Sequence, residues 1–589
     1  MARGRFTVIF TVLGLAVFVS IAGFVLLYVL VGREPSVSSN STLVLKVGGD
    51  LSEVAPSNVV GYIRGGSAPV VRTIVENLRK AKADPRVSAV LLKPTGFDSP
   101  YWAKVQEIRD AVLEFKKSGK PVYAYLEYGG DREYYLASAA DRVFLLPSSP
   151  LDLKGIATYA VFLRGTLDKI GAYPDMQHIG DYKTAMNQLT EKGYTRAHKE
   201  MDESLDRDLF DQLVRGIADA RKKTDAEVRK LIDQGPFLPE DALRAGLIDD
   251  VAYEDQVEDK LKKTDARLRK IEGDDYARVS AASFGLNRGP RIGVIYATGA
   301  ITSGKSGFDP LNGAALGSDT LIDAIRQARR DNSLRAIVLR IDSPGGSAAA
   351  SDAIWRELML AKNERTDRPI VASMSDLAAS GGYYIAMPAQ VIVAQPSTLT
   401  GSIGIFGGKI VTGGVYEKLG AHIDSTSIGK NAEMDSPVRP FNPEEAKKVQ
   451  EQLQAFYDGF VEKVAQSRHT TPEKIDAIAQ GRVWTGQQAK QNGLVDSLGG
   501  LDTAVAIAKQ RAKLSADTEV ELVVFPPRKN FYELLTDQFS GASDQAAMSR
   551  WLSSNLSKGE LEALRVMRGP LTMYRRGEPL ALMPMTFLR

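Results

Sequence analysis

The sequence predicts an α/β protein of two tandem repeat domains with mostly parallel sheets, preceded by one N-terminal transmembrane helix. Three observations predict it: a long internal repeat, strand and helix patterns that alternate within each copy, and one uncharged apolar run near the N-terminus. The chain has 589 residues, of which 44% are hydrophobic and 25% charged. That length and composition suit two or more globular domains.

The apolar run extends from Phe6 to Val31, 26 residues without a charge. A helix of that length can cross the roughly 30 Å of a bilayer's hydrocarbon core. Arg3 and Arg5 precede it, which favours a cytoplasmic N-terminus. We therefore expect residues 1–34 to be an uncleaved signal anchor, with the rest of the chain outside the cytoplasm. The alternative is a cleaved signal peptide, whose apolar core is usually shorter.

The internal repeat has a period near 250 residues. The stretch "LASAADRVFLLPSS" (136–149) resembles "IAMPAQVIVAQPST" (385–398), and each follows a pair of tyrosines. Tyr134 and Tyr383, which begin these pairs, are 383 − 134 = 249 positions apart, and "IGAYPD" and "LGAHID" share the same offset. Solenoid repeats are much shorter, so this period indicates two homologous domains.

Each copy alternates strand and helix patterns. In the second, "RAIVLRI" and "PIVASM" are β-branched runs on either side of a helical stretch near 351–362. This alternation is typical of βαβ units around a parallel sheet. We expect a first repeat domain at 42–270, a linker at 271–289, a second repeat domain at 290–530 and a C-terminal helical tail at 531–589.

Composition excludes some functions. Lys plus Arg total 75 against 72 Asp plus Glu, so the net charge of +3 gives no electrostatic reason to expect nucleic acid as a partner. There is no cysteine, and hence no disulfide framework. We find neither metal-ligand spacing nor a phosphate-binding glycine loop, so we expect no metal and no cofactor.

The stretch "SDLAASGGYYIA" holds a candidate nucleophile. Ser380 follows a strand pattern and precedes a helical one, so the amide of Gly381 would lie at a helix N-terminus, where it suits an oxyanion. A neighbouring strand ends in "RIDSPGG", where Gly345 or Gly346 would offer a second amide. The structural alternative is that Ser380 caps the helix and that the glycines form an ordinary turn.

A serine nucleophile needs a base, and the repeat suggests one. At the offset of 249, Ser380 corresponds to Asp131, and Lys183 of "GDYKTAM" corresponds to Ala432. One copy thus keeps a serine and the other a lysine, as an active site shared between two repeats would produce. A lysine acts as a base near pH 7 only if burial or a nearby positive charge lowers its pKa from about 10.4.

Histidine is the other possible base. His178 and His422 both differ from their repeat partners, and neither has an obvious carboxylate partner at local spacing. A Ser-His-Asp triad assembled in space remains the weaker hypothesis.

Four motifs together, "RIDSPGG", "SDLAASGGYYIA", "TLTGSIGI" and "GDYKTAM", resemble the signal peptide peptidase A (protease IV) family in its long, duplicated bacterial form. The resemblance covers residues 42–515 and the anchor. It implies tandem Clp-protease/crotonase-like domains and a Ser/Lys dyad of Ser380 and Lys183. It also implies an oxyanion hole at Gly345, Gly346 and Gly381, and it assigns Ser402 to orient the lysine.

The resemblance further implies what the protein does. We expect a serine endopeptidase of the bacterial inner membrane, single-pass, with its catalytic domains on the periplasmic side. Its partners would be the membrane, remnant signal peptides and other apolar unfolded peptides, and it would assemble as a homotetramer. Two alternatives stay open: a crotonase-type acyl-thioester enzyme and a non-catalytic membrane scaffold.

Overall fold

The computed structural model describes residues 34–54, 70–262, 268–309, 313–526, 578–584 and 587–588, together with residues 14, 18 and 23 singly. Within these ranges, no helix is both long enough and apolar enough to cross a membrane. The predicted anchor, residues 1–34, lies almost wholly outside the described residues.

The first repeat is built on a six-stranded sheet in which all neighbouring strands are parallel. Its strands, in spatial order, are β10 (Lys270–Glu272), β1 (Ser41–Gly49), β2 (Val87–Phe97), β3 (Val122–Leu126), β5 (Arg142–Leu145) and β9 (Asp250–Val251). The central strands are buried along most of their length. Because both faces of a parallel sheet are covered, such strands read as continuous apolar runs.

The second repeat has the same strand order. Its six parallel strands are β23 (Glu521–Phe525), β11 (Arg291–Thr298), β15 (Leu334–Ser343), β17 (Ile370–Ala379), β18 (Val391–Ala394) and β22 (Ser497–Leu498). The sheet is extended beyond β17 by β19 (Leu399–Gly401) and the antiparallel β21 (Val483–Thr485). The predicted α/β class with parallel sheets is confirmed, and the matching strand orders agree with the internal repeat.

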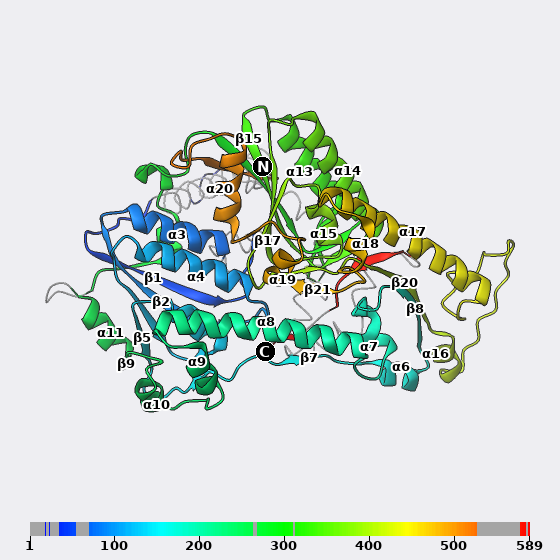
Figure 1. Cartoon of the computed structure of the whole chain (residues 1–589), viewed down its shortest axis with the longest axis horizontal. Coiled ribbons are helices and arrows are strands. Elements are labelled where there is room, and N and C mark those ends of the chain that lie inside the picture. The colour runs from blue at the N-terminus through cyan, green and yellow to red at the C-terminus, as the bar shows by residue number, and fades with distance from the viewer. Residues whose placement is uncertain are drawn as a thin grey trace, which may run out of the picture.

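Helices connect these strands. In the first repeat α3 (Val71–Ala83) and α4 (Ala103–Lys116) pack together, as do α13 (Ser318–Arg330) and α14 (Ala348–Glu364) in the second. The long α8 (Arg196–Arg221) runs from the first sheet toward β21 and α7 (Figure 1). The other helices of the described residues are α5 (Asp131–Ala137), α6 (Arg164–Ile170), α7 (Asn187–Thr190), α9 (Asp225–Ile232), α10 (Pro239–Arg244), α11 (Glu254–Leu261), α12 (Gly273–Ala277), α15 (Gly381–Ala386), α16 (Gly413–Lys418), α17 (Pro443–Ser467), α18 (Pro472–Asp476), α19 (Gly486–Gln491) and α20 (Leu501–Arg511), with 3-10 turns η1 (Thr184–Met186) and η2 (Ala281–Phe284).

A third, mixed sheet joins the two repeats. Its strands, in spatial order, are β13 (Gly307–Asp309), β14 (Gly313–Gly317), β12 (Ala300–Thr302), β16 (Gly345–Ser347), β24 (Leu580–Leu582), β20 (Ile405–Val411) and β8 (Tyr173–Ile179). Here β8 of the first repeat pairs antiparallel with β20 of the second. Figure 1 shows β24, in red, beside β20. Two separate two-stranded sheets lie outside these three: β4 (Gly129–Gly130) pairs with β6 (Leu151–Asp152), and β7 (Thr158–Tyr159) pairs with β25 (Phe587–Leu588).

The predicted linker and tail have local structure of their own. The 271–289 stretch contains part of β10, all of α12 and η2, and Lys80 donates hydrogen bonds to the carbonyls of Tyr276 and Val279 within it. Most of the predicted helical tail, 531–589, lies outside the described residues. The described part forms β24 and β25.

Buried charges also connect the repeats. Arg340 on β15 is 1% exposed and contacts two carboxylates of the first repeat, Glu53 at 2.8 Å and Glu107 at 2.6 Å. Burial alone would raise the pKa of Glu53, but the charge and hydrogen bonds of Arg340, with Lys104 nearby, lower it to about 2. For Glu107, burial and the charge of Glu53 outweigh Arg340, and its pKa is raised.

We expect Arg340→Ala to lower the free energy of unfolding by about 3–5 kcal/mol, because it removes the ion-pair partner of two buried carboxylates. The matched control is Arg335→Ala on the same strand, where the side chain is exposed and a change within about 0.5 kcal/mol is expected. Urea unfolding of both variants measures the difference. Equal stabilities would show that the cluster contributes little.

Candidate active site

Ser380 occupies the turn between β17 and α15. Its backbone has φ 56° and ψ −112°, a conformation that non-glycine residues rarely adopt and that is often found at functional sites. The Ser380 amide donates to the carbonyl of Gly401 at 2.7 Å. Its side chain makes no helix-capping hydrogen bond, so the simple N-cap interpretation does not describe it.

Lys183 lies directly against Ser380. The Lys183 Nζ is 2.7 Å from the Ser380 Oγ and 3.0 Å from both the Oγ and the carbonyl oxygen of Ser402. All three residues are fully buried. The contact forms within one chain, between residues 197 positions apart.

The pairing of β8 with β20 explains this meeting. Ile179, the last residue of β8, is opposite Ile405, the first residue of β20. Because the strands are antiparallel, the chain that leaves β8 and the chain that enters β20 lie at the same end of the pair. Lys183 follows the first strand by four residues and Ser402 precedes the second by three.

A glycine that sequence reasoning missed fixes the lysine backbone. Gly481 has φ +78°, and a Cβ atom built on it would lie 2.5 Å from the Cα of Lys183. The adjacent Gln480 carbonyl accepts from the amide of Tyr182 at 2.8 Å. The sequence signal is faint: Gly481 begins "GRVWTGQQAKQNGLVD" (481–496), which resembles "GPFLPEDALRAGLID" (235–249) of the first repeat.

The surroundings of Lys183 favour a neutral amine. Burial lowers its pKa well below the ordinary 10.5, since desolvation disfavours the charged form. Its three hydrogen-bonding partners are uncharged oxygens. A neutral amine has two N–H donors and one lone pair. With the two donors on the Ser402 oxygens, the lone pair faces the Ser380 hydroxyl, which can then donate to it.

The predicted glycines converge on the same point. A Cβ built on Gly345, whose φ is +97°, would lie 2.6 Å from the Gly381 nitrogen, and one built on Gly381 would lie 3.1 Å from the Gly346 nitrogen. The Gly345 amide already donates to the Ser343 Oγ at 3.2 Å. The amides of Gly346 and Gly381 are therefore the two best placed to face an oxyanion beside Ser380.

The equivalent place in the first repeat is filled by carboxylates. Asp131, the counterpart of Ser380, accepts from the amides of Lys154 at 3.0 Å and Gly155 at 2.9 Å. Burial raises the pKa of Asp131 to about 6. Glu133 accepts from the amide of Phe97, which corresponds to Gly346 at the offset of 249, at 3.0 Å. The amide that faces the site in the second repeat is thus occupied in the first.

The histidines lie elsewhere. His178 is exposed and contacts the carbonyl of Gly180, while His422 is also exposed. Among the described residues, no hydrogen bond joins a histidine to Ser380, so the triad hypothesis has no geometric support.

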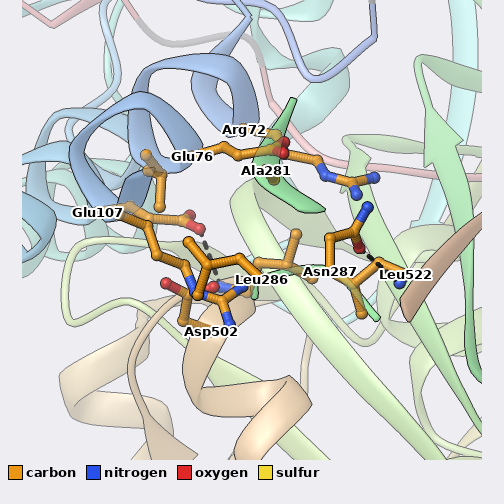
Figure 2. A pocket seen from close by; sticks show the side chains of 11 residues that line it. Arg72, Glu76, Glu107, Ala281, Leu286, Asn287, Asp502 and Leu522 are labelled. Atoms are coloured by element: carbon orange, nitrogen blue, oxygen red, sulfur yellow. Dashed lines mark hydrogen bonds between the residues drawn. The ribbon is translucent and has the colours of Figure 1, made fainter. Parts of the chain in front are cut away.

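A pocket at the junction of the repeats is separate from this site. Figure 2 shows it where α3 and α4 meet α20 and the 281–287 segment, with Glu107 accepting from the amide of Leu501 at 2.9 Å. Burial raises the pKa of Asp502 there. None of its lining residues belongs to the cluster around Ser380.

Comparison with known proteins gives consistent matches. The model of peptidase family S49 matches residues 114–269 and again residues 362–515. "Serine protease SPPA, chloroplastic" of Arabidopsis thaliana is 39% identical over 83% of this chain and 71% of its own length. "Protease 4" of Salmonella typhi is 36% identical, with 85% and 82% covered. "Protease 4" of Haemophilus influenzae is 30% identical, with 90% of each covered.

The α/β fold and these matches define a serine peptidase. The chain belongs to peptidase family S49, with two copies of the family domain. The resemblance inferred from the four motifs is confirmed at this level.

We expect Gly481→Ala to reduce peptidase activity at least about 10-fold, because its Cβ would displace the Lys183 backbone and small misplacements of catalytic groups are costly. Gly493→Ala is the matched control: its φ of +84° imposes the same backbone strain, but its Cβ would meet no atom within 4 Å. Backbone strain alone should cost each variant about 1 kcal/mol of stability, and Gly481→Ala should lose more because its Cβ would also meet the Lys183 backbone. Equal activities of the two folded variants would contradict the positioning role of Gly481.

Proposed function

We propose that the protein is a membrane-anchored serine endopeptidase with a Ser380/Lys183 dyad, which degrades remnant signal peptides and other apolar unfolded peptides. The observation that carries the proposal is the 2.7 Å separation of the Lys183 Nζ and the Ser380 Oγ in a fully buried site. A buried, neutral amine beside a serine hydroxyl is an arrangement suited to general-base catalysis.

In the first half of the reaction, the Ser380 Oγ attacks the scissile carbonyl carbon while its proton passes to the Lys183 lone pair. The carbonyl oxygen becomes an oxyanion, which the amides of Gly346 and Gly381 stabilise. The tetrahedral intermediate collapses when the C–N bond breaks, and protonated Lys183 gives its proton to the leaving amine. The products are an acyl ester on Ser380 and a peptide with a new N-terminus.

In the second half, neutral Lys183 takes a proton from a water molecule, whose oxygen attacks the ester. The Ser380–acyl bond breaks, Ser380 regains its proton from Lys183 and the acid product leaves. Ser402 supports both halves, because its two oxygens, each 3.0 Å from the amine, hold the lone pair toward Ser380.

The cellular role is inferred from sequence. The uncharged run from Phe6 to Val31 supports anchoring in the inner membrane, with the catalytic repeats on the periplasmic side. The name of one relative, "Putative signal peptide peptidase SppA" from Enterococcus faecium, supports the proposed substrates. Assembly as a homotetramer rests on the resemblance alone.

The two alternative functions have less support. A crotonase-type acyl-thioester enzyme would need the glycine amides but not the contact between Lys183 and Ser380. A non-catalytic scaffold would have no use for a buried amine without a counterion, which is costly to maintain.

We expect Ser380→Ala and Lys183→Met to abolish hydrolysis of an unfolded apolar peptide, with rates at least about 1,000-fold below wild type. Lys183→Arg should be equally inactive, because a guanidinium keeps its proton. A quenched-fluorescence peptide measures the rates, and thermal unfolding checks the fold. Turnover near the wild-type rate in any folded variant would refute the dyad.

We expect kcat/KM to rise with pH and to level off, because only the neutral amine accepts the serine proton. Since burial lowers the Lys183 pKa, the midpoint should lie well below 10.5, and activity should be lost as pH falls through it. A midpoint at or above 10.5 would show that Lys183 is not the titrating base.

Ser402→Ala should reduce kcat on the order of 10-fold with little change in KM, because it leaves the Lys183 amine poorly oriented.

A further inference from the structure

We propose that Arg482 is a positioning residue for the Ser380 site, because it joins the segment that carries Lys183 to the segment that carries Ser402. Its backbone bonds the Ser402 segment, and its side chain contacts Tyr182, the residue before Lys183. Arg482 acts through these neighbours on the separation of the lysine amine from the serine hydroxyl. This inference rests on the proposed function and deepens it, since it identifies what keeps the two halves of the dyad in register.

The backbone at Arg482 holds Ser402 in place. The Arg482 carbonyl accepts from the Ser402 amide at 2.7 Å, and the adjacent Gly481 amide donates to the Ile403 carbonyl at 2.8 Å. Ser402 has a φ of 49°, a conformation that non-glycine residues rarely adopt. These two hydrogen bonds hold it there, and they thereby fix the two Ser402 oxygens that lie 3.0 Å from the Lys183 amine.

The side chain of Arg482 closes a set of contacts between the two repeats. Its guanidinium carbon lies 4.7 Å from the centre of the Tyr182 ring and 4.5 Å from that of the Trp484 ring. Arg482 also donates to the Glu200 Oε1 at 2.9 Å, and the Tyr182 hydroxyl donates to the same oxygen at 3.0 Å. Glu200 belongs to α8, which runs beside β21, the strand that follows Arg482 (Figure 1). Tyr182, Glu200 and Arg482 are here called the clasp.

A displacement of Tyr182 would be passed on to Lys183, because the chain around them is tightly turned. The Lys183 amide donates to the Gly180 carbonyl at 3.1 Å, and the Thr184 amide donates to the Tyr182 carbonyl at 2.9 Å. A Cβ built on Gly180 would lie 2.4 Å from the carbonyl carbon of Gln480. Closely packed atoms of this kind transmit strain to their neighbours. By holding Tyr182, the clasp therefore also holds the lysine.

The clasp contributes little to stability. The Glu200 side chain is 51% exposed, and ion pairs with an exposed partner are weak. The Nε of Arg482 is buried and has no hydrogen-bond partner among the described residues, which costs free energy. An apolar side chain of similar length would avoid that cost. The guanidinium is therefore better explained by the geometry that it imposes on the site than by an effect on folding.

The first experiment compares Arg482→Met with Arg79→Met. Arg79 is the matched control, because it pairs with Glu519 in another partly exposed ion pair between the repeats, outside the clasp. Arg482→Met should lower kcat about 10-fold and leave KM within about two-fold of wild type, because it displaces Lys183 and no substrate contact. Arg79→Met should leave both constants unchanged. Equal kcat values of the two folded proteins would overturn the proposal.

Two further variants separate positioning from a general structural effect. Arg482→Lys keeps a cation beside Glu200 and the aromatic rings, so kcat should stay within about three-fold of wild type. Glu200→Ala changes an exposed side chain, so it should fold normally and lower kcat about five-fold. Glu203→Ala, three residues further along α8 and also exposed, is its control and should leave kcat unchanged.

The double variant of Glu200→Ala and Arg482→Met tests whether these residues act through one contact. Its loss of kcat should be no larger than that of Arg482→Met alone, because both substitutions remove the same interaction. Losses that multiply in the double variant would show that the two residues act independently, and they would overturn the clasp.

A last experiment does not depend on turnover. The chain has no cysteine, so Lys183→Cys introduces a single thiol at a fully buried position. Its rate of reaction with N-ethylmaleimide measures local opening of this segment. Adding Arg482→Met should speed the reaction at least about 10-fold, and adding Arg79→Met should not. Equal rates would overturn the positioning role whether or not the protein is a peptidase. A faster reaction, in a protein whose wild type lacks peptidase activity, would support the clasp and refute the proposed function.

Discussion

The antiparallel pairing of β8 with β20 is the contact on which the site depends. Each sheet of the two repeats is complete without it, yet this pairing brings the chain after Ile179 beside the chain before Ile405. Lys183 and Ser402 meet as a result, and the turn at Gly481 leaves room for the lysine backbone. The strained turn at Ser380 then places the Ser380 hydroxyl 2.7 Å from the Lys183 amine.

Two kinds of buried cation occur between the repeats, and they differ in their partners. Arg340 and Lys104 each lie between carboxylates, and the neighbouring negative charges raise the pKa of Lys104 despite its burial. Such groups stay charged and hold the repeats together. Lys183 is equally buried but has only hydroxyl and carbonyl oxygens around it, so its pKa falls. The presence or absence of a carboxylate partner distinguishes a structural cation from a potential base.

The turn at Asp131 in the first repeat and the equivalent turn at Ser380 in the second carry different residues. In the first repeat, Asp131 and Glu133 bind backbone amides and close the place where a substrate carbonyl would lie. In the second repeat, Ser380, Gly345 and Gly346 occupy the equivalent positions. β24 pairs antiparallel with β16, the strand that carries Gly345 and Gly346.

The sequence by itself determined the α/β class, the two repeats and the pairing of a serine in one copy with a lysine in the other. These follow from local patterns: hydrophobic periodicity specifies strands and helices, and a constant offset reveals duplication. Only the tertiary structure decided that β8 crosses to the other repeat, that the Gly345 amide donates to Ser343, that Gly481 supports Lys183 and that β24 pairs with both β16 and β20. These features depend on contacts between segments far apart in the chain, and on desolvation, which no local pattern encodes. The lowered pKa of Lys183 is of the same kind, because burial is a property of the folded chain and not of the residue.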